Sequence, residues 1–182
     1  LSLRAQVTDT LSLAAQAMLE WEPARFPEGG TYLGPVDFVF NGPDRQFLQL
    51  PAGAGGPGFA MRGPASEPKQ RGEWGVSARW SPAWLDGTLG FYYRNFADKL
   101  PQVLLTRVGP ASASRYNLIY TDDVDLFGIS LAKNIGRVSI GAEVSTRRNT
   151  PLNSQVLGIA VGLPEEGETK GPRGNTYHAL VN

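Results

Sequence analysis

Strict alternation of side chains between positions 138 and 147 constrains the fold of this chain more than any other feature. Successive side chains of a β-strand point to opposite faces of its sheet, so a period of two predicts a strand. The residues on the other face are polar, charged or glycine. The first face carries Val138, Ile140, Ala142, Val144 and Thr146.

The preceding residues, 125–132, repeat this pattern and predict the partner strand of a hairpin. Their apolar row consists of Phe127, Ile129 and Leu131. Residues 133–136 would form a four-residue connection, and pairing Ala132 with Arg137 would place both apolar rows on one face. The two arms span about 8 and 12 residues, and a tilted strand needs about 9 to 11 residues to cross a bilayer.

The same alternation recurs along the chain, in residues 1–7, 11–22, 73–81, 88–94 and 177–181. Pairing Val7 with Leu11, and Ser81 with Thr88, keeps the apolar rows of neighbouring segments on one face. The pattern therefore predicts an antiparallel sheet of about seven strands.

Three long segments rich in Gly and Pro separate these strands: residues 23–71, 97–125 and 150–174. We expect all three to be extracellular loops, and residues 51–64 in particular to form no regular strand or helix. Residues 36–40 and 47–50 are apolar pieces that form short strands or fold into a lumen. Tyr116, Leu118 and Tyr120 are expected to extend the main sheet above a membrane.

Short and long connections thus alternate, as the periplasmic turns and external loops of outer-membrane barrels do. Four tryptophans fall where two aromatic girdles belong, Trp21 and Trp74 at the long-loop end and Trp80 and Trp84 at the turn end. We therefore predict an all-β fold, an antiparallel up-and-down transmembrane β-barrel with long extracellular loops. A soluble β-sandwich is the alternative, and it would have shorter loops and fewer charges on one face.

A barrel of this class has an even number of strands and no open edge in lipid. We therefore expect further strands to come from additional sequence or from a partner. The chain also begins and ends within alternating patterns, and we interpret it as a segment of a longer precursor.

Composition excludes several other classes. No run of about 18 apolar residues exists, which argues against a membrane helix. The 17 basic and 17 acidic residues balance, so nothing indicates a nucleic-acid-binding patch. The chain has no Cys, and its glycines form no phosphate-binding loop.

Several stretches resemble one known family. They are GFYYRNFADKLP at residues 90–101, GAEVSTRRNTPL at residues 141–152, and shorter matches at residues 29–33, 72–76 and 125–130. In this order they resemble a proteobacterial outer-membrane β-barrel family filed as domain of unknown function 1302. The resemblance covers most of the chain, which would be an internal segment of a larger member.

The resemblance implies a larger single-chain barrel with a signal peptide, located in the outer membrane of a Gram-negative bacterium. Genes of such proteins often neighbour those of a periplasmic protein that resembles lipoprotein carriers, of resistance-nodulation-division exporters, and of proteins acting on hydrophobic or steroid-like compounds. The expected partners are the lipid bilayer of the outer membrane, the periplasmic companion protein and exporter components. The family has no established catalytic residues, so none are carried over, and no cofactor is expected.

Polar residues opposite the apolar rows are the candidate lumen lining. They form either a mixed-charge passage or a ladder of ion pairs that holds the barrel's shape, and their mixed signs argue against strong ion selectivity. This row is Arg4, Gln6, Gln16, Glu20, Glu22, Glu73, Arg79, Arg94, Arg137, Glu143, Arg147 and His178. Loop contacts that shape or plug the mouth are expected from Phe38, Phe40, Phe47 and Leu48.

Two further candidate sites are weaker. His178 is the one histidine, and it would serve a serine hydrolase only beside Ser130, Ser139 or Ser145 and an orienting partner. The acidic cluster Asp122, Asp123 and Asp125 is a candidate Ca²⁺ site, although its spacing is more typical of a solvated loop. We therefore expect a barrel that passes or binds hydrophobic compounds. The alternatives are a barrel that anchors an envelope assembly and, less favoured, an outer-membrane enzyme.

Overall fold

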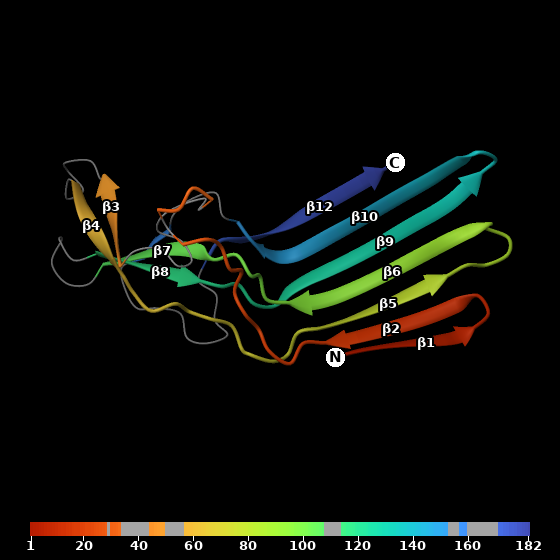
Figure 1. Ribbon diagram of the computed structural model, residues 1–182, viewed down its shortest axis with the longest axis horizontal. Coiled ribbons are helices and arrows are strands. Elements are labelled where there is room, and N and C mark those ends of the chain that lie inside the picture. Colours follow the sequence, from red (N-terminus) through yellow and green to blue (C-terminus); the bar gives the residue numbers. More distant parts are fainter. Residues whose placement is uncertain (29, 34–43, 50–56, 108–113, 153–156, 160–170) are drawn as a thin grey trace.

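The computed structural model describes residues 1–28, 30–33, 44–49, 57–107, 114–152, 157–159 and 171–182. In these residues the chain forms twelve β-strands arranged in two sheets. Figure 1 shows the larger sheet at the right and β3, β4, β7 and β8 of the smaller sheet at the left. The all-β prediction is confirmed. No helix in the described part of the chain is long and apolar enough to cross a membrane.

The larger sheet has seven strands, each antiparallel to its neighbours. In spatial order they are β1 (Ser2–Thr8), β2 (Leu11–Ala17), β5 (Trp74–Trp80), β6 (Gly87–Phe96), β9 (Val124–Ile135), β10 (Val138–Pro151) and β12 (Arg173–Val181). The sheet is open, and β1 and β12 form its two edges (Figure 1). Short turns lie at one end, here the turn end, and long connections leave from the other, here the connection end.

The register aligns apolar residues in rows across all seven strands, which we call the apolar face. One row contains Leu3, Ala15, Val76, Tyr93, Phe127, Thr146 and Tyr177. The next contains Ala5, Leu13, Ala78, Phe91, Ile129, Val144 and Ala179. The predicted sharing of one face by the apolar rows is therefore confirmed.

The turn between β5 and β6 matches the sequence prediction. Trp80 pairs with Leu89, which sets Ser81 opposite Thr88, and the hydroxyls of Ser81 and Thr88 are 2.9 Å apart.

The turn between β1 and β2 differs from the prediction. Leu11 pairs with Thr8 instead of Val7, and the register shifts between Gln6 and Thr8. The Thr8 hydroxyl oxygen accepts the Leu11 backbone N–H at 3.1 Å and the Thr10 N–H at 3.3 Å. The side chain of Thr8 thus closes this turn, which explains the irregular register.

The turn between β9 and β10 is also tighter than predicted. The strands continue until Ile135 pairs with Val138, so the connection is two residues long, and Ala132 pairs with Gly141 instead of Arg137. Gly136 has φ 61°, as a type II′ turn requires at its first central residue. The partner of Ala132 moves by an even number of positions, so both apolar rows stay on the predicted face.

The long connections are not the structureless loops that composition suggests. They contribute a five-stranded sheet, here the connection sheet, in the order β11 (Leu157–Ile159), β7 (Gln102–Arg107), β8 (Ser114–Ile119), β4 (Pro57–Arg62) and β3 (Arg45–Gln49). The expected loops at 97–125 and 150–174 also overlap the ends of the main sheet, because β9 begins at Val124, β10 continues to Pro151 and β12 begins at Arg173.

Two detailed expectations for these connections are wrong. β4 lies inside the Gly- and Pro-rich stretch 51–64, and its proline is the first residue of the strand, where the missing N–H is tolerated. Tyr116 and Leu118 belong to β8 of the connection sheet and do not extend the main sheet.

A small core lies where the main sheet meets the connections. Trp21, Ala97, Leu118 and Tyr120 are buried together, with Val103 packed against them. The rings of Trp21 and Tyr120 meet edge to face, with their centroids 4.8 Å apart. The predicted strand 11–22 therefore ends at Ala17, and Trp21 turns into this core instead of joining an outward-facing girdle.

Candidate functional site

The apolar face of the main sheet is exposed. Leu3, Ile129 and Val144 expose 72%, 53% and 62% of their surface. Along β9 the face is bounded by Asp125 at the connection end and interrupted by Lys133 near the turn end, with three apolar side chains between them. A shallow apolar groove of about 770 Å³ follows this face from Leu3 to Tyr177.

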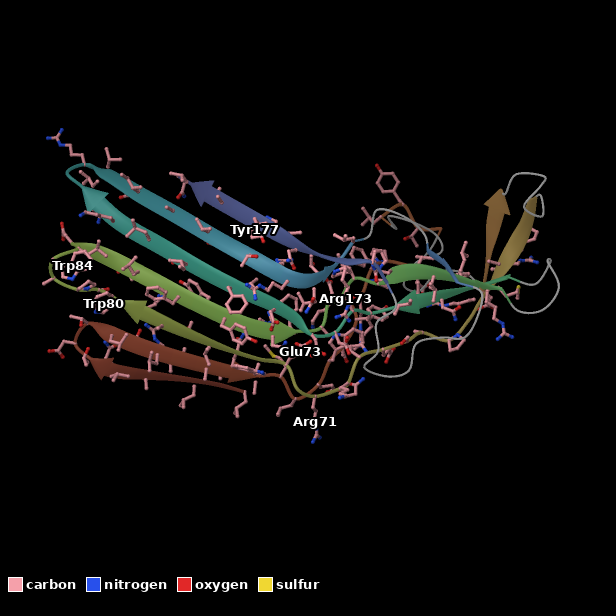
Figure 2. All side chains as sticks on the ribbon, turned by 180° about the vertical axis from the view of Figure 1, so that it is seen from behind. Arg71, Glu73, Trp80, Trp84, Arg173 and Tyr177 are labelled. Atoms are coloured by element: carbon pink, nitrogen blue, oxygen red, sulfur yellow. The ribbon has the colours of Figure 1, made fainter. Side chains whose placement is uncertain are left out.

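Aromatic side chains gather at both ends of the apolar face. At the connection end Trp74, Tyr93 and Phe127 form a ladder across three strands, with successive ring centroids 5.0 and 4.9 Å apart. At the turn end the ring centroids of Trp80 and Trp84 are 6.0 Å apart. Figure 2 labels both residues at this end of the sheet. Three of the four predicted girdle tryptophans are thus exposed at the expected ends.

The opposite side, here the polar face, carries the predicted inward row only in part. One register row contains Ser2, Gln16, Gly75, Arg94, Leu126, Arg147 and Thr176. The next contains Arg4, Ala14, Ser77, Tyr92, Gly128, Ser145 and His178. A third contains Gln6, Ser12, Arg79, Gly90, Ser130, Glu143 and Leu180.

A hollow of about 430 Å³ opens on the polar face over β1, β2, β5 and β6. Arg4, Gln16, Tyr92, Arg94 and Leu126 surround it, and small residues of β2 and β5 form its floor.

Glu73 anchors the connection end of the polar face. It is only 8% exposed, and its carboxylate accepts the Ala97 backbone N–H at 2.9 Å. The other carboxylate oxygen lies 3.5 Å from the Arg94 guanidinium, which also stacks 4.8 Å from the Phe96 ring. Glu73 therefore fixes the start of β5 to the end of β6.

The remaining members of the predicted row lie at the ends of the polar face or beyond its strands. Gln6 donates its amide to the Thr8 carbonyl at the first turn, and Arg137 is exposed at the tip of the β9–β10 turn. Glu20 and Glu22 follow the end of β2, and Glu22 pairs with Arg25 at 3.1 Å. The sequence pattern therefore assigned more acidic residues to the polar face than the structure places there.

The hydrolase arrangement does not assemble among the described residues. Ser145 is the register partner of His178, but the His178 ring nitrogen contacts the Thr176 hydroxyl at 3.2 Å. Ser130 is hydrogen-bonded to Tyr92, and Ser139 donates to Asn134 at 2.8 Å. No described carboxylate orients the imidazole.

The acidic cluster also separates into different roles. Asp122 pairs with Arg173 at 2.9 Å, whereas Asp125 accepts hydrogen bonds from Tyr93 at 2.7 Å and Asn95 at 3.0 Å. The described residues contain no group of carboxylates or histidines arranged to hold a metal ion. The predicted Ca²⁺ site therefore has no structural support.

The predicted loop contacts are only partly described. Phe38 and Phe40 lie outside the described residues. The backbone of Phe47 and Leu48 belongs to β3, where they pair with Phe59 and Gly58 of β4.

Two polar contacts at the junction escaped prediction. Gln102 is 5% exposed and donates its amide to the carbonyls of Leu152 at 3.4 Å and Pro172 at 3.2 Å. Arg173 reaches Asp122 across a similar separation in sequence, and Figure 2 shows Arg173 and Glu73 at this junction. No local pattern signals such contacts, because their partners are 50 or more residues away.

Comparison with known proteins identifies one family. No curated protein and no solved structure matches the chain. The model of the family described as protein of unknown function (DUF1302) matches residues 1–182, the same family that the sequence motifs resemble. The chain therefore belongs to the DUF1302 family.

Proposed function

We propose that this chain forms part of the wall of an outer-membrane β-barrel that gives passage or binding to hydrophobic compounds. The observation that carries the proposal is the two-faced main sheet. One face is a continuous, exposed apolar surface, and the other carries arginines, hydroxyls and glycines. A barrel wall needs such a division between its lipid side and its lumen.

The height of the apolar face fits a bilayer. Asp125 and Lys133 lie on this face of β9, and at about 3.4 Å per residue they are about 27 Å apart along the strand. With the usual tilt of about 40°, this becomes a height of about 20 Å, near the roughly 25 Å apolar band of outer-membrane barrels. Lys133 fits the boundary, since its long stem lets the charge reach the interface.

The open edges imply additional strands. Unpaired backbone groups of β1 and β12 would cost several kcal/mol each in hydrocarbon. We therefore propose that strands from outside this chain close the barrel, in keeping with the even strand numbers of the class. The connection sheet would then stand over the external mouth.

Adjacent residues of β10 test the proposal. Val144→Cys and Ser145→Cys place a thiol on opposite faces, in a chain that has no cysteine of its own. In the native protein in its membrane, we expect a small water-soluble thiol reagent to label Ser145→Cys and to spare Val144→Cys. Since Val144 is 62% exposed in the isolated chain, preferential labelling of Val144→Cys would refute the lipid-facing assignment.

The ordered connection sheet favours a second candidate function. The buried core around Trp21 lies where the connections meet the main sheet, and we propose that the connection sheet beyond it would anchor an envelope assembly. Proteoliposomes carrying the native protein distinguish the two. Flux of a hydrophobic dye above that of empty liposomes supports passage, whereas absent flux with a stable stoichiometric partner supports anchoring. Neither candidate involves catalysis.

A further inference from the structure

Charge on the polar face is less balanced than the sequence suggests. Within the described strands of the main sheet, its cationic residues are Arg4, Arg79, Arg94 and Arg147. Its acidic residues are Glu143 and, at the connection end, Glu73. Glu73 forms an ion pair with Arg94, and the other three arginines form no ion pair with any described residue. A solute at this face therefore meets an excess of positive charge.

We propose that the hollow on the polar face binds an anionic amphiphile, a hydrocarbon chain that ends in a carboxylate. This inference deepens the proposed function and rests on it for the route by which the compound arrives. The volume of about 430 Å³ lies within the range of small-molecule sites.

Arg4 is the residue that recognises the carboxylate. It is exposed on β1, lines the hollow and has no described acidic partner, so its planar guanidinium is free to hold a carboxylate by two hydrogen bonds. Gln16, which is diagonal to Arg4 on the neighbouring strand, is a second polar side chain that lines the hollow. Arg94 stands three strands away, about 14 Å across the sheet, and its charge is already satisfied by Glu73.

The rest of the hollow suits a hydrocarbon chain. The floor is formed by the small residues Ala14, Gly75 and Ser77, and the Gln16 side chain covers it only at Gly75. A Cβ on Gly75 would stand 3.1 Å from the Gln16 amide nitrogen, which shows how closely that side chain lies over the floor. Tyr92 and Leu126 supply apolar contacts on the side away from Arg4. The geometry thus sets a cationic head site beside an apolar trough.

Calorimetry of octanoate and octanol tests this site. The native protein is embedded in lipid nanodiscs, and heats from empty discs are subtracted. The two probes share a chain length and differ in the head group, so octanoate should bind about tenfold more tightly, as expected for a hydrogen bond to a charged group. Equal affinities in the unmodified protein would overturn the proposal without any variant.

Two matched variants locate the site. Arg4→Gln should remove the preference for octanoate, whereas Arg79→Gln, outside the hollow on the same face, should change it by less than twofold. If both variants lost the preference for octanoate equally, the preference would come from the overall positive charge of the face, and the assigned site would be refuted. Acetate at the same concentration should not displace octanoate, and full displacement would refute the apolar trough. The cysteine labelling of β10 is independent of these outcomes, so failure of the barrel proposal is distinguishable from failure of this site.

Discussion

Replacing Ile129 by arginine tests most directly what surrounds the apolar face. Ile129 lies midway between Asp125 and Lys133 on this face of β9, which is the midplane of the proposed bilayer position. An arginine on the lipid face costs about 2–4 kcal/mol there. Since about 1.4 kcal/mol corresponds to a factor of ten, the unfolding equilibrium constant should rise about thirtyfold to several hundredfold.

A sheet in water would respond differently. Ile129 is 53% exposed, so an arginine at this position could extend its charge into solvent. Substitutions at such positions usually change stability by less than about 0.5 kcal/mol. The two environments therefore predict effects that differ severalfold in free energy.

Two control variants on the same strand distinguish the effect of depth in the bilayer from the effect of which face of the sheet carries the arginine. Ile135→Arg lies beyond Lys133 near the turn, where an arginine costs about 0–1 kcal/mol. Ala132→Arg lies on the exposed polar face and should cost little in a water-filled lumen. The expected order of destabilisation is Ile129→Arg far above the other two variants.

The assay is equilibrium urea unfolding of the native protein refolded into phospholipid vesicles, followed by tryptophan fluorescence. Free energies of unfolding for the parent and the three variants come from the same lipid and the same protein concentration. A cost below about 0.5 kcal/mol for Ile129→Arg, or equal costs for Ile129→Arg and Ala132→Arg, would refute the lipid-facing assignment.

Three further predictions concern the junction. Trp21→Ala should destabilise the protein by about 3–5 kcal/mol, because it empties a buried site against Tyr120, and thermal unfolding measures this loss. Glu73→Gln should cost less than Glu73→Ala, since the amide oxygen can still accept the Ala97 N–H; equal costs in urea unfolding would argue against that hydrogen bond. Burial raises the pKa of Tyr120 above its ordinary value of 10.0, so the unfolded state releases the phenol proton first and rising pH favours unfolding. The contribution of Tyr120 to stability is complete below about pH 10 and is lost above it. Tyr120→Phe should therefore make Tm fall less steeply between about pH 9 and 12. A Tm profile that is unchanged in this variant would contradict the burial effect.

The main sheet was predictable because its signal is local. A period of two is a property of each strand alone, and it assigns every side chain to a face before any pairing is known. The errors at the turns after Thr8 and Ile135 did not change the faces, because the segments beyond each turn kept their parity. The β1–β2 turn depends on the Thr8 hydroxyl, which accepts backbone N–H groups, and the β9–β10 turn depends on Gly136 with its positive φ. The sequence does not show which residues pair at either turn.

The connection sheet was not predictable in the same way. Its strands β4 and β8 pair Ala60 with Ser114, which come from different long connections. Gly and Pro content placed most of these segments outside the main sheet, although their ends overlap β9, β10 and β12. Composition carries no information about pairing between distant segments. Trp21 illustrates the consequence, since its place in the alternation suggested a lipid-facing girdle and its contacts with Leu118 and Tyr120 bury it.

The polar face shows a second limit of reasoning from sequence, and this one bears on function. Alternation gathers acidic and basic residues into one row of nearly balanced sign, which suggests a lining without selectivity. In the structure Glu20 and Glu22 lie beyond the end of β2 and are not part of the sheet. Glu73 is paired with Arg94 and accepts the Ala97 backbone N–H. A ligand on this face would interact with the charge that remains unpaired, and the sequence alone does not identify that charge. On the polar face this remainder is basic, which is why we propose a hydrophobic compound that carries a carboxylate as its ligand.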